Sequence, residues 1–571
     1  MKRYSKLYSW LNSQQVFFWI FVVAIALPNF ALAFTEQMPV LTKVCNVVLP
    51  FSVFWHLFTL TRKPGKMFWI LFLFIFFDAF QIVLLYLFGE SVIAVDMFLN
   101  VVTTNSSEIN ELLGNLIPGV ATVFVIYGAT IFFAVRSVLS KKTLGTEFRR
   151  RQRRYSSVGI VAGLLLMACC ALFTRGFSVY HHIFPVNVTY NMIEAIDRQM
   201  SNKHYFDTSR SFTFHATSTH DAGEKEIYVM VVGETARAMN FHIYGYNRPT
   251  TPCLEAYPNV VAYTDAVTES NTTHKSVPML LSAVSAENFN DIYHQKSIIT
   301  AFKEAGFHTI FLSNQRPNHS FIDFFGEEAD YSEFIKESMP SKAIVLDAEL
   351  LPLLREQIER SSNPKIFAVL HTYGSHFNYR ERYREEDSFF KPDTAMDAKF
   401  KNREMLLNAY DNSIRYTDRF LGDLIAMLRQ QGGSAAIAYT SDHGEDVFDD
   451  DRRLFLHASP IPSYYQLHVP LVFWASHEYI ERHSNEWKAI EANREQAVSG
   501  SKEMFHTLLT LAGITSDLRI DSLSLASPHF RAGERHYLTD HNEAIPLGET
   551  GMGRHDLSMF EKMGVKVEQG K

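Results

Sequence analysis

The chain has 571 residues, of which 47% are hydrophobic and 14% aromatic, and its formal net charge is −7. This length is enough for two or three domains and excludes a peptide hormone or a small disulfide scaffold. Residues 1–200 hold 17 Lys and Arg against 9 Asp and Glu, whereas residues 201–571 hold 37 against 52, together with 20 of the 23 His. A basic, apolar front joined to an acidic, histidine-rich back argues against intrinsic disorder, a collagen-like repeat and a one-piece cytosolic enzyme.

Apolar stretches in the front part predict a transmembrane bundle. Five of them approach the length that crosses a bilayer, and they cover residues 16–34, 44–60, 67–88, 116–135 and 157–172. The first also resembles a signal peptide, with Ala31-Leu32-Ala33 as a cleavage-like site, but its long apolar run favours an uncleaved anchor.

Basic residues next to the spans predict their orientation. They precede the first span, follow the second, and form a run at 149–154 between the fourth and fifth. By the positive-inside rule these places are cytoplasmic, so five crossings put the chain after about residue 175 on the opposite side of the membrane. The run could also be a nucleic-acid patch, but its position between two spans favours the topological interpretation.

A long loop between the third and fourth spans carries polar residues at helical spacing. Asn100, Thr104 and Glu108 recur every four residues, which would place them on one face of a helix beside the membrane. From pattern alone, the simpler interpretation is a solvated face with a helix cap.

The back part has the pattern of an α/β domain. A polar linker at residues 200–224 is followed by strand-like runs that alternate with helical patterns, at 227–232, 308–312, 366–370, 435–440 and 469–474. The clearest helix covers residues 405–429 and ends before Gly432-Gly433. This alternation predicts a mainly parallel sheet between helices.

Polar residues follow three of the predicted strands. Glu234 follows the first, His371 and His376 follow the third, and Asp442-His443 follow the fourth. Ligands bind at the carboxyl ends of strands in open parallel sheets, so these residues together predict a metal site. Each one alone is more often an ordinary surface residue or helix cap.

A nucleophile could come from the hydroxyl-rich segment 269–278, at the start of a helix whose free N–H groups favour a phosphoryl group. Spacing does not choose among its hydroxyl residues, and a plain helix N-cap is the alternative.

Taken together, these motifs resemble the bacterial phosphoethanolamine transferases, the lipid A modifying enzymes behind polymyxin resistance. The resemblance rests on Val231-Val232-Gly233-Glu234-Thr235-Ala236-Arg237, Thr273 with Ser276-Val277-Pro278, the segment from His371 to His376, Tyr410-Asp411-Asn412-Ser413, Ser441-Asp442-His443-Gly444-Glu445 and Leu456-His457. It implies a five-helix transmembrane domain over residues 1–175, a linker with bridging helices over 176–224, and a periplasmic catalytic α/β domain of the alkaline phosphatase and sulfatase superfamily over 225–571.

The resemblance also implies roles for individual residues. Glu234, Thr273, Asp442 and His443 correspond to the zinc ligands, and Thr273 is also the nucleophile. His376 and His457 correspond to residues near the transferred phosphate and at an additional zinc, and His371 is expected in the same pocket. Asn100, Thr104 and Glu108 fall where family members contact the ethanolamine head group. One firmly bound Zn²⁺ is expected, and the presence of a second is left open.

The implied reaction is ping-pong transfer from phosphatidylethanolamine through a phosphothreonine, with release of diacylglycerol. The expected acceptor is lipid A, with core oligosaccharide or another envelope glycan as the alternative. The expected protein is a monomer in the bacterial inner membrane that has no nucleic-acid partner.

One departure concerns rigidity of the nucleophile segment. Lipid A enzymes of this kind carry a disulfide around it, whereas Glu269 and Met279 stand at those positions here, and Cys253 is the only Cys of the back part.

Other functions fit the sequence less well. A sulfatase needs Arg where Leu280 stands, and phosphoglycerol transferases share the spans and the nucleophile but not the Gly-Glu-Thr-Ala-Arg signature. A receptor or inactive scaffold would predict a broken ligand set. A transporter would need more ionisable residues in its spans than Asp78.

Overall fold

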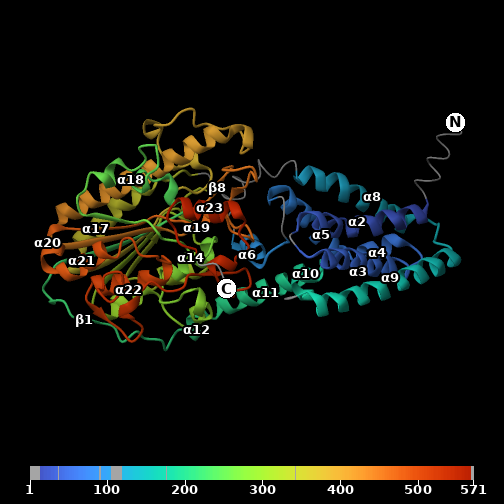
Figure 1. Ribbon diagram of the computed structural model, residues 1–571, viewed down its shortest axis with the longest axis horizontal. Coiled ribbons are helices and arrows are strands. Elements are labelled where there is room, and N and C mark those ends of the chain that lie inside the picture. Colours follow the sequence, from blue (N-terminus) through green and yellow to red (C-terminus); the bar gives the residue numbers. More distant parts are fainter. Residues whose placement is uncertain are drawn as a thin grey trace. The chain divides into compact units, whose positions relative to one another are not determined.

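The computed structural model describes residues 13–36, 38–88, 92–103, 119–174, 177–340 and 343–567. The chain divides into two compact units, one of Met1–Val101 with Leu112–Asp197 and one of Val102–Glu111 with Arg198–Lys571. Each unit has its own hydrophobic core, and Figure 1 labels their elements.

The first unit consists of apolar helices. Four helices in its described part are long and apolar enough to cross a membrane: α2 (Gln14–Thr35), α3 (Val40–Phe58), the segment Gly119–Leu139 and α9 (Thr146–Phe173). A fifth candidate is the pair α4 (Pro64–Ile70) and α5 (Phe72–Phe88), which is bent by 73°. The segment Gly119–Leu139 contains a π-helical turn, η1 (Phe124–Gly128), before α8 (Ala129–Leu139). The shorter helices α6 (Val95–Thr103) and α10 (Val179–His182) precede α11 (Val186–Lys203).

Two of the predicted spans differ from the observed helices in detail. The third is broken at Leu71 rather than continuous. The fifth is only the carboxyl-terminal part of α9, which begins at Thr146 and carries the arginine run 149–154 on its first turns. Arginine is a good helix former, so this helix starts well before its apolar segment.

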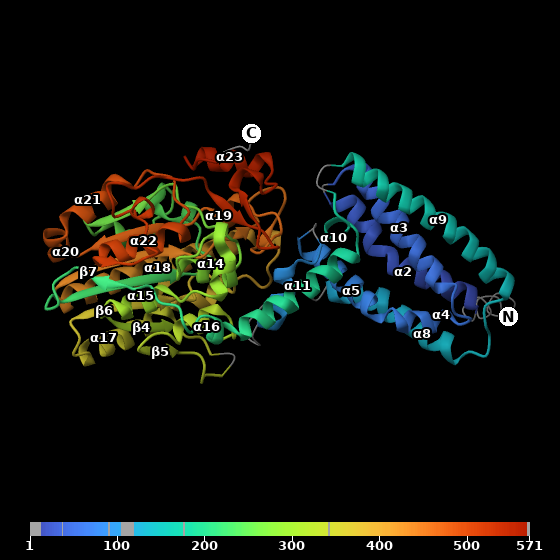
Figure 2. The same ribbon diagram turned by 90° about the horizontal axis from the view of Figure 1, so that it is seen from below.

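Glycines allow close packing of α9 against α3 in this unit. A Cβ atom added to Gly163 would lie 2.8 Å from Leu49 Cα, and one added to Gly159 would lie 2.4 Å from Ser52 Oγ. Small residues let helix backbones approach each other in apolar surroundings. Figure 2 shows the two helices side by side.

The second unit is built around a seven-stranded sheet of order β3-β10-β7-β2-β6-β4-β5. Its strands are β2 (Glu226–Gly233), β3 (Val260–Tyr263), β4 (His308–Ser313), β5 (Tyr331–Phe334), β6 (Lys365–His371), β7 (Ser434–Ser441) and β10 (Leu471–Ala475). The central pairs are parallel, whereas β10 runs antiparallel to both β7 and β3. The prediction of a mainly parallel sheet is therefore confirmed.

Both faces of the sheet are covered by helices. Along β2, Tyr228, Met230 and Val232 enter one core, and the alternate residues Ile227, Val229 and Val231 enter the other. Side chains alternate between the two faces of a strand, so a strand that is apolar throughout must be buried on both sides.

The helices divide between these two cores. The first core receives α14 (Thr273–Leu280), α15 (Ile298–Glu304), α16 (Phe321–Gly326), α20 (His477–Arg482), α21 (Ser484–Ala492) and α22 (Ser501–Leu511). The second receives α17 (Leu350–Arg360) and α18 (Arg403–Gln431), whose C-cap Gly432 has a positive φ of 65°. Figures 1 and 2 show the sheet between these helices.

Shorter elements complete the described part of this unit. The two-stranded sheets pair β1 (Thr217–Ser218) with β11 (Ile514–Thr515), β8 (Asp446–Val447) with β9 (Phe455–Leu456), and β12 (His536–Leu538) with β13 (Ala544–Pro546). The short α-helices are α12 (Tyr205–Thr208), α13 (Pro252–Glu255), α19 (Tyr464–Leu467) and α23 (Arg554–Lys562). The 3-10 helices are η2 (Ala238–Asn240), η3 (His242–Tyr244), η4 (Ala286–Tyr293), η5 (Asp347–Glu349), η6 (Tyr379–Arg382), η7 (Glu385–Asp387), η8 (Phe400–Asn402), η9 (Asp521–Leu523) and η10 (Leu547–Glu549).

Candidate active site

The register of two neighbouring strands brings Glu234 and Asp442 together. β2 and β7 are parallel, and their last residues, Gly233 and Ser441, are paired. The next residue of each strand is a carboxylate. The Asp442 N–H donates to the Gly233 carbonyl at 3.1 Å, and the Thr235 N–H donates to Asp442 Oδ1 at 3.1 Å. Parallel pairing thus places both acids at the carboxyl edge of the sheet.

A tight turn fixes the Glu234 side chain. Thr235 has a φ of 63°, a conformation that a β-branched residue rarely adopts, and its hydroxyl donates to Glu234 Oε1 at 2.8 Å. Gly374 lies against this turn, and a Cβ atom there would approach the Glu234 carbonyl oxygen to 2.7 Å. The strained turn and the close glycine leave little freedom to the carboxylate.

The side chains of Glu234, Asp442, His443 and Thr273 converge in this place. His443 Nε2 lies 3.1 Å from Thr273 Oγ1, 3.2 Å from Asp442 Oδ2 and 3.5 Å from Glu234 Oε1. Thr273 Oγ1 lies 3.3 Å from Glu234 Oε1. The two acids and the imidazole are buried, and in the described part of the chain Asp442 Oδ2 makes no hydrogen bond.

These four groups fit a divalent cation. The acids and His443 form one of two groups in the described residues whose ligand atoms all lie within 4.8 Å of one another. His443 Nδ1 lies 2.9 Å from the Gly444 carbonyl oxygen, which only accepts, so Nδ1 carries the proton and Nε2 presents its lone pair. Two carboxylates, one imidazole and one hydroxyl make a small oxygen and nitrogen shell that suits Zn²⁺, and Mn²⁺ or Mg²⁺ also accept oxygen-rich shells.

Burial sets the protonation of the site. It raises the pKa of Glu234 to about 7 and that of Asp442 to about 6, and the mutual repulsion of the two acids adds to the effect on Glu234. It lowers the pKa of His443 to about 3, so this imidazole is neutral at physiological pH. Two buried acids beside a neutral histidine form an anionic site that a cation would neutralise.

Thr273 is the hydroxyl residue of its segment that faces the acids. It is the first residue of α14, and Thr272 is the N-cap. Ser270 and Thr272 hydrogen-bond to each other at 3.1 Å, and Ser276 donates to the Thr272 carbonyl at 3.0 Å. Of these hydroxyl groups, that of Thr273 therefore lies within 3.3 Å of Glu234 Oε1, while that of the buried Ser276 bonds to the helix backbone.

A second pair of histidines adjoins this group. The ring centroids of His443 and His457 are 4.2 Å apart, and those of His457 and His376 are 6.3 Å apart. His457 Nδ1 lies 3.0 Å from Glu445 Oε1. Burial opposes the charge on His457, but the Glu445 carboxylate prevails and raises its pKa, whereas burial lowers the pKa of His376 well below its ordinary value.

His371 occupies a different position. It is the last residue of β6 and pairs with Val232, so alternation places it on the same face as Val369, in the first core. Its Nδ1 lies 3.0 Å from Ser313 Oγ, and burial lowers its pKa to about 3. The structure places His371 within the face of the sheet and outside the group of four.

Sequence reasoning missed three supporting residues. Glu445 orients His457, Gln315 donates to Glu234 Oε2 at 3.0 Å, and the buried Arg237 pairs with Asp449 at 2.6 Å. Arg237 also donates to the Glu445 carbonyl at 2.9 Å, which ties the turn after β2 to the one after β7. Glu445 and Arg237 stand inside the motifs that carried the resemblance, so their positions were visible although their roles were not.

The three residues expected at the ethanolamine head group lie in or beside a part of the chain that the structure does not describe. Asn100 lies on α6, but its side chain is outside the described residues, as are Thr104 and Glu108.

Residues 226–514 match the sulfatase family. The chain belongs to this family. This match covers the sheet and its helices, including Glu234, Thr273, Asp442 and His443.

Relatives of this sulfatase-family chain include transferases. The Kdo(2)-lipid A phosphoethanolamine 7''-transferase of Escherichia coli strain K12 is 26% identical over 56% of this chain and 57% of its own length. The putative transferase YhbX of the same strain is 26% identical over 66% of this chain and 67% of its own length. The chain thus spans little more than half of the lipid A transferase.

Solved structures support the fold of both units. The integral membrane lipooligosaccharide phosphoethanolamine transferase EptA of Neisseria meningitidis covers 91% of this chain and 97% of its own, with a TM-score of 0.68 and 22% identity. The periplasmic domain of Escherichia coli EptC, solved in complex with Zn, covers 62% of this chain and 98% of its own, with a TM-score of 0.55 and 22% identity. At this identity the likeness shows the fold: apolar membrane helices followed by a sulfatase-like domain.

Proposed function

We propose that this protein transfers phosphoethanolamine from phosphatidylethanolamine to lipid A or another envelope glycan, through a phosphothreonine at Thr273. The observation that carries the proposal is the Thr273 hydroxyl, which lies 3.3 Å from Glu234 Oε1 and 3.1 Å from His443 Nε2 at the start of a helix. A threonine hydroxyl is a weak nucleophile unless a base or a metal activates it. The named relatives that transfer phosphoethanolamine support the choice of group.

Glu234, Thr273, Asp442 and His443 would hold the Zn²⁺ ion. When bound, this ion supplies positive charge that stabilises a threonine alkoxide and the equatorial oxygens of the phosphoryl group. A second ion near His376 and His457 is part of the same proposal, which rests on the proximity of these rings. This ion would bind His457 in its neutral form, so the proton transfer described next belongs to the enzyme with one ion.

The first half-reaction uses groups that the chain itself provides. Thr273 Oγ1 loses its proton, for which Glu234 Oε1 is an acceptor within reach, and attacks phosphorus. The bond between phosphorus and the diacylglycerol oxygen breaks as the Thr273–phosphorus bond forms. His457, whose pKa the Glu445 carboxylate raises against the effect of burial, donates a proton to the departing oxygen. His376 lies beside it and contacts the phosphoryl group.

The second half-reaction reverses these roles. An oxygen of the acceptor attacks phosphorus, the Thr273–phosphorus bond breaks, and the threonine regains its proton. His457, left neutral by the first half, takes the proton of an acceptor hydroxyl. Two half-reactions that share one covalent intermediate give ping-pong kinetics. His371 supports the sheet beneath this pocket.

The chain is proposed to act as a monomer in the bacterial inner membrane. Residues 1–175 form the transmembrane domain with a cytoplasmic N-terminus, residues 176–224 link it to the periplasmic side, and residues 225–571 form the periplasmic catalytic domain. Asn100, Thr104 and Glu108 would contact the ethanolamine head group, and alanine variants that raise the KM for the lipid donor would support this role.

Intact-mass analysis tests the intermediate. Full-length protein incubated with phosphatidylethanolamine should gain one phosphoethanolamine, and peptide mapping should place it on Thr273. Thr273→Ala should abolish the adduct, and the matched variants Thr272→Ala and Ser276→Ala should retain it. An adduct on either neighbour, or none on wild-type protein with metal bound, would contradict the assignment. Mass spectrometry of lipid A and core oligosaccharide, from cells with and without this gene, then identifies the acceptor.

A further inference from the structure

A second cluster of potential metal ligands lies at the other end of β2. It consists of His220, Glu224, Glu226 and His483, and we call it the distal cluster. Glu226 begins β2, whereas Glu234 follows its end. Eight residues at about 3.3 Å each separate the two acids by about 26 Å. The distal cluster is therefore separate from the candidate active site.

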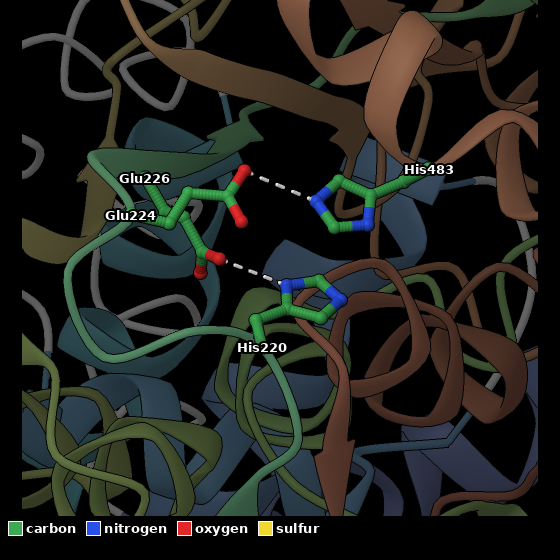
Figure 3. Close-up of side chains that lie close together, drawn as sticks. All are labelled: His220, Glu224, Glu226 and His483. Carbon is green, nitrogen blue, oxygen red and sulfur yellow. Dashed lines mark hydrogen bonds and ion pairs between the residues drawn. The ribbon is translucent and has the colours of Figure 1, made fainter.

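The four side chains of the distal cluster converge from three segments (Figure 3). His220 and Glu224 lie between β1 and β2, and His483 directly follows α20. His220 Nδ1 is 2.9 Å from Glu226 Oε1, and His483 Nε2 is 3.3 Å from Glu224 Oε1. One ligand atom from each of the four residues lies within 4.8 Å of the other three.

The distal cluster is shielded from solvent. Exposure of the four side chains ranges from 0% for Glu226 to 12% for His483. In the described part of the chain, Glu226 Oε2 is buried and makes no hydrogen bond, although Lys365 Nζ lies 3.7 Å away. The hydrogen bonds of that ammonium go to Ser218 Oγ and the His220 carbonyl instead. The distal cluster therefore contains one buried carboxylate oxygen, Glu226 Oε2, that no hydrogen bond occupies.

The two imidazole rings lie face to face, with centroids 3.9 Å apart and planes that differ by 16°. A metal ion lies in the plane of each imidazole that binds it, so at least one ring must turn when both bind the same ion. Gly513 allows this position of His220, because a Cβ atom there would approach the ring to 2.3 Å. The adjacent pairing of β1 with β11 fixes the segment that carries His220.

We propose that the distal cluster binds a divalent cation of the Zn²⁺ type through two imidazole nitrogens and two carboxylate oxygens. Zn²⁺ prefers four such donors at about 2.0 to 2.2 Å, which places neighbouring donor atoms about 3.3 Å apart. His483 Nε2 and Glu224 Oε1 already have this spacing at 3.3 Å, whereas His220 Nδ1 and Glu226 Oε1 are hydrogen-bonded at 2.9 Å and would separate slightly. Each imidazole would bind the ion as a neutral ring. The nitrogen that binds the ion is then unprotonated, and the single ring proton is on the other nitrogen.

The bound ion would have a structural role. It would fasten the segment between β1 and β2 to the start of the central strand and to the end of α20. Such a clamp holds the chain where it enters the sheet, and it contributes no group to phosphoryl transfer.

Metal content tests this proposal on full-length protein in detergent. After zinc loading and desalting, the double variant His220→Gln/His483→Gln should hold one equivalent of zinc less than wild type. His215→Gln is the matched control, because His215 is an exposed histidine of the same segment that pairs with Asp517 at 2.7 Å. Equal zinc content in wild type and double variant would overturn the proposal.

A second measurement keeps the test valid if the double variant misfolds. Glu234→Gln/Asp442→Asn/His376→Gln/His457→Gln removes proposed ligands of both active-site ions but leaves the distal cluster intact. Zn²⁺ should still raise the Tm of this variant, and Co²⁺ should give it the visible absorption of a tetrahedral site. A Tm that is the same with Zn²⁺ and with chelator would refute the site, since a network of ion pairs alone gives that result. Neither readout depends on chemistry at Thr273, so the proposed function and the distal site fail separately.

Discussion

The loop that leads to Thr273 is held by a buried acid, and this gives a stability prediction. Glu269 is fully buried, its Oε1 accepts from the Ala286 N–H at 3.2 Å, and its Oε2 lies 2.5 Å from Ser501 Oγ. Burial raises its pKa from the ordinary 4.5 to about 8. Glu269→Gln keeps the shape and both hydrogen bonds but cannot ionise.

The linkage between protonation and folding sets the direction in which stability changes with pH. A carboxyl group whose pKa is raised in the folded protein contributes stability below its unfolded pKa and loses it as pH rises through the folded value. Between about pH 5 and 8, wild-type protein should therefore lose about 1.4 kcal/mol of stability per pH unit relative to Glu269→Gln, or about 3 kcal/mol by pH 7. For a unit of this size that difference shifts the Tm by about 5 °C.

Thermal unfolding of full-length protein at pH 5, 6, 7 and 8 measures this difference. The variant should melt above wild type, by a margin that widens with pH. Comparison of the two curves isolates Glu269, because other titrating groups such as Glu503 are present in both. Glu287→Gln is the control, since that carboxylate is 43% exposed and pairs with Lys502. Parallel curves for Glu269→Gln and wild type would refute the reasoning.

Three further outcomes are expected. Glu445→Gln removes the charge that raises the pKa of His457. The alkaline limb of the pH–rate profile for diacylglycerol release should therefore move to lower pH. A limb that does not move would show that His457 is not the general acid. Arg237→Met leaves Asp449 buried without its cation and should lower the free energy of unfolding by about 3 to 5 kcal/mol. The Tm should fall accordingly, and Asp449→Leu in the same protein should partly restore it. A Tm equal to that of wild type would contradict this role of Arg237. Gly163→Leu should lower the Tm of the first unit, because the larger side chain separates α9 from α3. Gly128→Leu should leave this Tm unchanged, since a Cβ atom added there meets nothing within 4 Å. Equal effects of the two substitutions would count against close packing of α9 on α3.

The gathering of polar residues at the carboxyl edge of the sheet was predictable, because it follows from the pattern of the strands. Apolar runs that end in Glu234 and in Asp442-His443 identify two strands, and parallel pairing brings their ends together. Sequence alone could not give the antiparallel direction of β10, because the apolar run of a buried strand carries no information about its direction.

Choices that depend on side-chain direction could not be made from the sequence. Thr273 differs from Thr272 only by which hydroxyl faces Glu234 across the fold. Like Glu234, His371 comes after a run of apolar residues. His371 is the last residue of β6, whereas Glu234 lies one residue beyond the end of β2. Strand alternation therefore directs the His371 side chain into one face of the sheet.

Long-range packing explains the remaining differences between the structure and what the sequence predicted. No Pro or Gly marks the break at Leu71, so composition predicts one straight span there. His483 joins His220 only through the fold, since 263 positions separate them in the chain. Contacts of this kind require the tertiary structure.

The two ends of β2 show how charge compensation separates two sites with similar ligands. At the distal cluster, Lys365 and Arg482 lie 3.7 and 3.0 Å from the glutamates, so protein cations already neutralise much of the charge. At the candidate active site, burial raises the pKa values of both acids, and the nearest imidazole, His443, is neutral. A cation there relieves a larger electrostatic cost, and it should therefore be held more tightly than one at the distal cluster. The uncompensated charge near Thr273 thus fits the proposed metal-assisted phosphoryl transfer, and the compensated charge of the distal cluster fits the proposed structural role.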